Sequence, residues 1–173
     1  MLTLNCNGDD PKAPELTDGI IHLMTTVKTI EVESEVAMKA LGEKLGGLLS
    51  GGEVIELAGD VGAGKTTFVK GLAHGMGIDE DVQSPSFTIS RIYDARGNLQ
   101  LAHYDFYRLN NPGIMASELA EMTQNPQATT IIEWADIVKG VLPGNRVRII
   151  ITAPTETTRE LNIEGPDRLV GRL

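Results

Sequence analysis

The sequence predicts an α/β domain built on a mixed, largely parallel central sheet. In the first half of the chain, strand-like apolar runs alternate with segments of helical periodicity, and in the second half strand-like runs predominate. A glycine-rich loop directly follows an early strand candidate and precedes a periodic helix. With 173 residues, 41% of them apolar, the chain has the length and composition of one ordinary domain.

The N-terminal half predicts a tail, a strand, a helix and a second strand. Residues 1–24 lack clear periodicity, so we expect an N-terminal tail or extension there. The β-branched run 25–32 is strand-like, and Ser34 suits the N-cap of the helix after it. The apolar residues on one face of that helix are Ala37, Leu41, Leu45 and Leu48. A compact apolar strand at 54–57 leads into Gly59.

A second helix and a hairpin follow the glycine-rich loop. The helix is amphipathic and ends at Gly77. Its apolar face is formed by Val69, Leu72, Ala73 and Met76. Strands at 87–93 and 99–105 flank Gly97-Asn98, a pair typical of tight turns, so the sequence predicts an antiparallel hairpin here.

The C-terminal part predicts a short helix and three strands. We expect the helix near residues 117–122. A compact apolar strand at 129–133 ends in a carboxylate, and two further strands are expected at 147–151 and 159–163. We take 25–165 as the domain and 166–173 as a C-terminal tail.

Charge and composition exclude several classes of protein. The net charge is −9, from 15 Lys and Arg against 24 Asp and Glu, which argues against broad electrostatic binding of nucleic acid. Cys6 is the only cysteine, so neither a disulfide framework nor a multi-cysteine metal site is expected. No signal-peptide pattern or membrane-spanning apolar run is present in the sequence, which favours a cytoplasmic protein without a membrane association.

The glycine-rich loop carries the main functional signal. Residues 59–66 read G-D-V-G-A-G-K-T, a match to the G-x-x-x-x-G-K-[ST] phosphate loop. Glycines allow backbone N–H groups to surround phosphate oxygens, while Lys65 reaches the β- and γ-phosphates and the Thr66 hydroxyl coordinates Mg²⁺. The residues expected to bind nucleotide here are Gly62, Ala63, Gly64, Lys65, Thr66 and Thr67.

A phosphate loop needs a carboxylate near the metal, and two strand ends offer one. Glu133 ends the apolar strand 129–133, and Asp105 ends the strand 99–105. Trp134 could equally pack in the core or stack near a nucleotide. The three histidines lack metal-ligand spacing, and we expect them to be structural. Because the guanine-reading N-K-x-D motif is absent from the sequence, adenine is the expected base.

Four ordered motifs resemble the TsaE (YjeE) family. They are G-D-V-G-A-G-K-T-T-F-V at 59–69, S-P-S-F-T at 84–88, H-Y-D-F-Y-R-L at 103–109 and I-E-W at 132–134. The resemblance covers about residues 30–152. It implies a three-layer P-loop NTPase-type fold and a monomeric bacterial ATPase that uses ATP and Mg²⁺. Such proteins assist the TsaD–TsaB complex, which forms threonylcarbamoyladenosine (t6A) at position 37 of ANN-decoding tRNAs, so tRNA would be involved only indirectly.

The resemblance also implies a role for individual residues. Lys65 would hold the phosphates, Thr66 and Glu133 would be Mg²⁺ ligands, and Asp105 would position or deprotonate the attacking water. Ser84, Ser86 and Thr88 would belong to a switch-like loop that senses the γ-phosphate. Trp134 would lie close to the nucleotide, and Ser34 would lie where the family lines the adenine. Ser86 departs from the family's usual threonine but keeps the hydroxyl.

Two other functions remain open from the sequence. A small-molecule P-loop kinase would need an acceptor pocket and an arginine-bearing lid, and neither is evident between residues 109 and 131. A non-hydrolytic adaptor gated by nucleotide would bind ATP and leave it intact. For the ATPase we expect slow hydrolysis alone, stimulated by the partner complex, with Arg108 as a candidate for an arginine supplied in cis.

Overall fold

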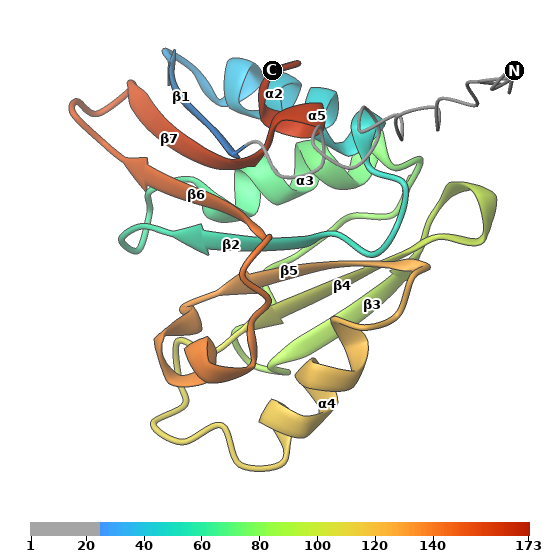
Figure 1. Cartoon of the computed structure of the whole chain (residues 1–173). Coiled ribbons are helices and arrows are strands. Elements are labelled where there is room, and N and C mark those ends of the chain that lie inside the picture. Colours follow the sequence, from blue (N-terminus) through green and yellow to red (C-terminus); the bar gives the residue numbers. More distant parts are fainter. Residues whose placement is uncertain (1–24) are drawn as a thin grey trace, which may run out of the picture.

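The computed structural model describes residues 25–173, which fold around one seven-stranded sheet (Figure 1). The strand order is β1-β7-β6-β2-β5-β4-β3. The strands are β1 (Thr25–Val32), β2 (Val54–Ala58), β3 (Ser90–Asp94), β4 (Gln100–Asp105), β5 (Ala128–Glu133), β6 (Val147–Thr152) and β7 (Arg159–Pro166). The helices are α2 (Glu35–Leu48), α3 (Lys65–Gly75), α4 (Met115–Met122) and α5 (Asp167–Val170), with short 3₁₀ helices η2 (Arg96–Asn98) and η3 (Ala135–Val141). The expected tail at 1–24 lies outside the described residues.

The sheet is parallel at its centre and antiparallel at both edges. Strand β2 pairs in parallel with β5 and β6, and β4 pairs in parallel with β5. At one edge β7 and β1 are added antiparallel, and at the other β3 forms a hairpin with β4. This confirms the predicted mixed sheet and hairpin. The carboxyl ends of β2, β4 and β5 therefore meet at one edge of the sheet, where open α/β sheets bind ligands.

Helices cover both faces of the sheet, which gives three layers. Helices α2 and α3 lie on one face, and α4 and η3 lie on the other (Figure 1). Alternate residues of each central strand enter different cores. On β2, Ile55 belongs to the core that includes Phe68 of α3, whereas Val54 belongs to the core that includes Leu119 of α4. The central strands are buried on both sides because each must fill two cores.

Four glycines bring α2 and α3 into close contact. A Cβ atom on Gly42 or Gly46 of α2 would lie 2.3 and 2.1 Å from backbone oxygens of α3. A Cβ atom on Gly71 or Gly75 of α3 would lie 2.0 and 2.1 Å from backbone oxygens of α2. The two helix backbones can therefore touch only because these positions lack a side chain. Ser34 caps α2 as predicted, since its hydroxyl accepts from the Ala37 N–H at 3.1 Å.

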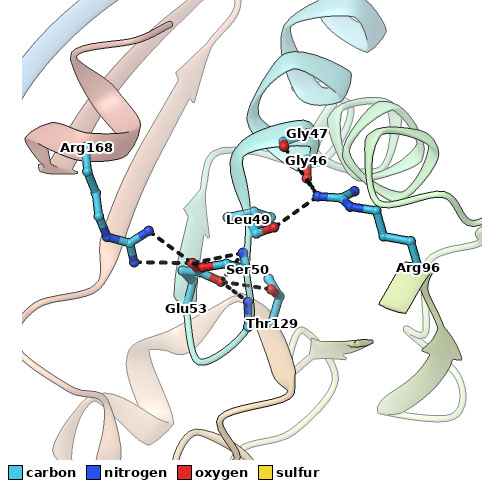
Figure 2. A network of polar contacts seen from close by, with 9 residues as sticks. Gly46, Gly47, Leu49, Ser50, Glu53, Arg96, Thr129 and Arg168 are labelled. Atoms are coloured by element: carbon cyan, nitrogen blue, oxygen red, sulfur yellow. Dashed lines mark hydrogen bonds and ion pairs between the residues drawn. The ribbon is translucent and has the colours of Figure 1, made fainter. Parts of the chain in front are cut away.

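Arg96, in the turn between β3 and β4, holds the other end of this helix pair. Its guanidinium donates to the carbonyls of Gly46, Gly47 and Leu49 at the end of α2, and to the Gly75 carbonyl at the end of α3 (Figure 2 shows the α2 side). A cation at two helix C-termini satisfies carbonyls that the helices leave free. The hairpin thus fixes α3, which carries the phosphate loop at its opposite end.

A second network ties the start of β2 to the end of the chain. Glu53 is buried, and its carboxylate accepts from the backbone N–H groups of Ser50 and Gly51, from the Thr129 hydroxyl and from Arg168 of α5 (Figure 2). The buried carboxylate is stable because each oxygen has a donor. Arg168 also joins α5 to the sheet.

Two expectations from the sequence need correction. Residues 87–89 form a turn rather than the start of β3, because the N–H groups of Thr88 and Ile89 both donate to the Pro85 carbonyl. The stretch expected as a C-terminal tail is part of the core, since Leu169 and Val170 of α5 are 1% and 0% exposed. Two apolar residues in a four-residue helix are too few for a periodic signal.

Candidate functional site

The phosphate loop joins β2 to α3 at the carboxyl edge of the sheet. Its glycines adopt φ angles that favour residues without a Cβ, with +147° at Gly59, +82° at Gly62 and +104° at Gly64. Helix α3 begins at Lys65, and no side chain in the described range 25–173 caps it. The first-turn N–H groups are therefore available to an anion, which the helix dipole also favours.

The Lys65 side chain lies across the inside of the loop. It is 6% exposed, and Nζ donates to the carbonyls of Gly59 at 2.8 Å and Asp60 at 3.1 Å. Nζ also lies 3.9 Å from Oε2 of Glu133 and 4.7 Å from the ring centroid of Trp134. This buried ammonium group has a carboxylate and an aromatic face beside it, and it still carries hydrogen-bonding capacity for phosphate oxygens.

Two strand-end carboxylates lie side by side beneath the loop. Asp105 of β4 and Glu133 of β5 are register partners on neighbouring parallel strands, and they are 3% and 2% exposed. Glu133 accepts from or pairs with Nε2 of His103 at 3.0 Å. Both carboxylates that the sequence offered as candidates near the metal therefore lie at the site.

Asp105 is held by the loop that carries the expected switch residues. Its Oδ2 accepts from the hydroxyls of Ser84, at 3.0 Å, and Ser86, and these two hydroxyls are 2.8 Å from one another. Its Oδ1 accepts from the Tyr107 N–H at 2.9 Å. The Ser86 hydroxyl, from one of the expected switch residues, therefore contacts the carboxylate that is the candidate for positioning water.

These groups line one pocket of about 540 Å³. Its lining residues are Val61, Gly62, Gly64, Lys65, Thr66, Thr67, Ser84, Ser86, Phe87, Asp105, Tyr107, Arg108, Glu133 and Trp134. A volume of this order accommodates a nucleotide-sized ligand. Segments as far apart in the chain as residues 61–67 and 133–134 thus meet at one pocket, with cationic, hydroxyl and carboxylate groups lining it.

Three predicted site residues lie outside this lining. Ala63 of the loop is 4% exposed, and its carbonyl accepts from Arg159 at 3.1 Å. Thr88 is exposed and does not line the pocket. Ser34 lines an adjoining hollow of about 420 Å³, which shares Gly62, Gly64 and Thr67 with the first.

Exposed aromatic and apolar side chains form the rim of the pocket. Phe87 is 84% exposed, Val61 71% and Tyr107 52%, and the Arg108 guanidinium lies 4.3 Å from the Phe87 ring centroid. The Tyr107 and Trp134 rings contact one another with centroids 4.8 Å apart. Large exposed apolar side chains grouped around a pocket are typical of interaction sites.

Backbone strain is concentrated beside the pocket. Ile89 has a φ of +70° and Trp134 a φ of +56°, in a region that bulky side chains rarely adopt. Ile89 follows the loop that binds Asp105, and Trp134 follows Glu133. Strained residues of this kind are often found at functional sites.

Two contacts of the site were not predicted from the sequence. His103 was expected to be only structural, yet it contacts Glu133; its position two residues before Asp105 on one strand places both on the same face, which is the signal that could have shown it. Arg159 reaches the phosphate loop from 96 residues away, and no local pattern shows such a contact.

The donors present at the pocket suit Mg²⁺. The Thr66 hydroxyl and the carboxylates of Glu133 and Asp105 are oxygen ligands of the type that this cation prefers. Within residues 25–173, no group of three or more His, Cys, Asp or Glu side chains is arranged to hold a metal. The arrangement is the one expected where a hydroxyl, a carboxylate and phosphate oxygens share the ion.

In the described part of the chain, helix length and hydropathy give no candidate for a membrane-spanning helix.

Comparison with known proteins gives a consistent result. The family model described as "Threonylcarbamoyl adenosine biosynthesis protein TsaE" matches residues 32–161. Proteins named "tRNA threonylcarbamoyladenosine biosynthesis protein TsaE" from Bacillus subtilis and Treponema pallidum are each 38% identical, over 125 and 122 residues. These alignments cover 71% and 70% of this chain and 76% and 89% of the relatives.

A solved structure agrees with the sequence matches. The structure described as "Crystal structure of Bacillus subtilus YdiB" superposes with a TM-score of 0.70 and 31% sequence identity. The match covers 86% of this chain and 93% of the other.

Proposed function

This chain belongs to the TsaE family of threonylcarbamoyl adenosine biosynthesis proteins, and on that premise we propose that it binds and hydrolyses ATP with Mg²⁺ during t6A formation on tRNA. The family role in t6A biosynthesis follows from the membership. The nucleotide chemistry is supported chiefly by one observation: the phosphate loop, both strand-end carboxylates and the loop carrying Ser84 and Ser86 line the same pocket.

The phosphate loop would bind the triphosphate. Free N–H groups of the first turn of α3 would bind phosphate oxygens, and Lys65 would exchange the carbonyls of Gly59 and Asp60 for the β- and γ-phosphates. The adjoining hollow beside Ser34 would receive the base. We propose adenine, in keeping with the absence of a guanine-reading motif from the sequence.

The carboxylates would divide the remaining chemistry. Thr66 and Glu133 would hold Mg²⁺, which supplies charge neutralisation on the β- and γ-phosphate oxygens when bound. Asp105 would orient the attacking water or accept its proton. The hydroxyls of Ser84 and Ser86 already occupy one of its oxygens, so movement of this loop would change how Asp105 meets the water.

The partner in this proposal is the TsaD–TsaB complex. The exposed rim formed by Phe87, Tyr107 and Arg108 lies at the mouth of the pocket, where a bound partner would also exclude water from the phosphates. We propose a monomer that acts in the cytoplasm and reaches tRNA only through that complex. Hydrolysis would then be slow alone and faster when the partner completes the site.

One assay tests this function and separates its alternatives. Phosphate release is measured with ATP and with GTP, each with and without purified TsaD–TsaB. We expect hydrolysis of ATP in preference to GTP, and stimulation by the complex. A phosphorylated small-molecule product would support a kinase, bound ATP that stays intact in both conditions would support an adaptor, and full hydrolysis without any partner would contradict the proposed dependence.

A further inference from the structure

His103 is a fully buried histidine that contacts the carboxylate of Glu133. Its side chain is 0% exposed, and Nε2 lies 3.0 Å from Oε1 of Glu133. The two residues are 30 positions apart in the chain, on the parallel strands β4 and β5. His103 and Asp105 lie on the same face of β4 because side chains alternate along a strand. The imidazole therefore lies two residues further from the carboxyl end of the strand than Asp105 and its register partner Glu133.

The hydrogen bonding shows how the imidazole is oriented. An ionised carboxylate can only accept, so with Glu133 ionised the 3.0 Å contact requires a proton on Nε2 of His103. Nδ1 is buried and has no hydrogen-bond partner among residues 25–173. Burying an unpaired polar atom costs free energy, and an aliphatic side chain would fill this position without that cost. The hydrogen bond to Glu133 is therefore what an imidazole provides here and an aliphatic side chain would not.

The two oxygens of Glu133 face different neighbours. Oε1 binds His103, whereas Oε2 lies 3.9 Å from Nζ of Lys65 and so faces the phosphate loop. We propose that His103 is a positioning residue, which fixes Oε1 so that Oε2 is presented to Mg²⁺ beside the phosphates. This inference rests on the proposed function, because it assigns Glu133 to the metal. Removal of a residue that hydrogen-bonds to a metal ligand commonly lowers metal affinity by about 10- to 100-fold.

Two amide substitutions form a matched test. In His103→Gln the amide nitrogen can reach the position of Nε2 and still donate to Glu133, whereas in His103→Asn the amide ends near the position of Nδ1. Thr130→Val is the control, because the Thr130 hydroxyl is buried on β5 without a partner in the described chain. Trp134 is the only tryptophan and lines the pocket, so its fluorescence reports binding.

The measurement is ADP affinity with increasing Mg²⁺, together with ADP affinity in EDTA. We expect His103→Asn to weaken the apparent Mg²⁺ affinity at least tenfold, and His103→Gln and Thr130→Val to stay within about threefold of wild type. The affinity of these three variants for ADP in EDTA should change little, and this result would show that their phosphate loop is folded. Equal Mg²⁺ affinity in the Asn and Gln variants would overturn the inference.

The wild-type titration keeps the two proposals apart. If wild-type protein binds ADP without any dependence on Mg²⁺, the proposed metal site fails, and this inference fails with it. If the wild-type dependence is present and His103→Asn preserves it, only the role of His103 is wrong.

A second measurement needs no substitution that could prevent folding. Nitrogen-15 NMR of histidine-labelled wild-type protein identifies which ring nitrogen of each histidine carries the proton, and exposed His74 provides an internal reference. We expect a slowly exchanging Nε2 proton on His103, whose signal shifts when Mg²⁺ is added to the ADP complex. A proton on Nδ1 alone would overturn the inference, because Nε2 could not then donate to Glu133.

Discussion

At the scale of single residues, Lys65 is the side chain on which phosphate binding most depends. We expect Lys65→Ala to weaken ATP binding by about 100-fold, since a lysine that hydrogen-bonds to phosphate contributes roughly 1.5–3 kcal/mol. Equilibrium titration followed by Trp134 fluorescence measures this. Lys70→Ala is a matched control on the same helix, where Lys70 pairs with Asp81 at 3.0 Å outside the pocket. Equal affinity of the two variants would contradict the role of Lys65.

Asp105 should affect turnover more than binding. In Asp105→Asn, the shape of the side chain and much of its hydrogen bonding are kept, but its ability to accept a proton is lost. We expect ATP affinity within about threefold of wild type and turnover lowered by about 100-fold or more. Steady-state phosphate release with TsaD–TsaB, compared with ATP binding, measures both effects. Unchanged turnover would remove Asp105 from the mechanism.

Burial of Tyr104 makes the folding stability of the protein decrease at alkaline pH. Burial, with a smaller contribution from the charge of Glu118, raises the pKa of Tyr104 to about 12. The unfolded chain then ionises first, so the stabilisation is complete below pH ~10 and is lost as pH rises from ~10 to 12. We expect Tyr104 to account for about 1 kcal/mol of lost stability at pH 11.

The test compares urea unfolding of wild type and Tyr104→Phe at pH 8 and pH 11. The variant keeps the ring, which stacks on Phe106, and removes a hydroxyl that has no partner within residues 25–173. Its stability should decline less than that of the wild type. The same decline in both proteins would show that another group is responsible.

At the scale of elements, the contact between α2 and α3 decides where the phosphate loop lies. We expect Gly71→Ala to lower the free energy of unfolding by about 2 kcal/mol or more, because its Cβ would lie 2.0 Å from the Lys39 carbonyl oxygen. Gly47→Ala is the matched control on the exposed side of α2, where no atom lies within 4 Å of the added Cβ. It should be neutral or raise stability by up to ~1 kcal/mol. Chemical denaturation measures both, and a Gly71→Ala variant as stable as wild type would contradict the close packing.

The elements themselves were largely predictable from local pattern. β1 has the expected bounds, Ser34 caps α2, and the expected helix after the glycine-rich loop is α3. The predicted start of β3 was wrong because a turn overrides the strand-like composition there. Residues 87–89 are strand-like in composition, but the turn that begins at Pro85 leaves Ile89 at a positive φ, where β-branched side chains are rare.

At the scale of the whole molecule, the sheet explains which parts of the site the sequence could reveal. The phosphate loop, Asp105 and Glu133 were predictable because each follows or ends a strand, and parallel strands end at one edge. The contacts of His103 with Glu133 and of Arg159 with Ala63 depend on strand register and on chain segments 30 and 96 residues apart. Strand alternation places His103 on the face of Asp105, but no local pattern pairs it with Glu133 or pairs Arg159 with Ala63.

The central claim is that the pocket above β2, β4 and β5 holds the triphosphate of ATP. A crystal structure with Mg²⁺ and a non-hydrolysable ATP analogue tests it most directly. We predict phosphate density enclosed by the backbone of residues 62–66, with Mg²⁺ contacting Thr66 and the Glu133 carboxylate. Nucleotide density at another surface, or a loop that leaves Lys65 on the Gly59 carbonyl with no phosphate beside it at saturating analogue, would contradict the account.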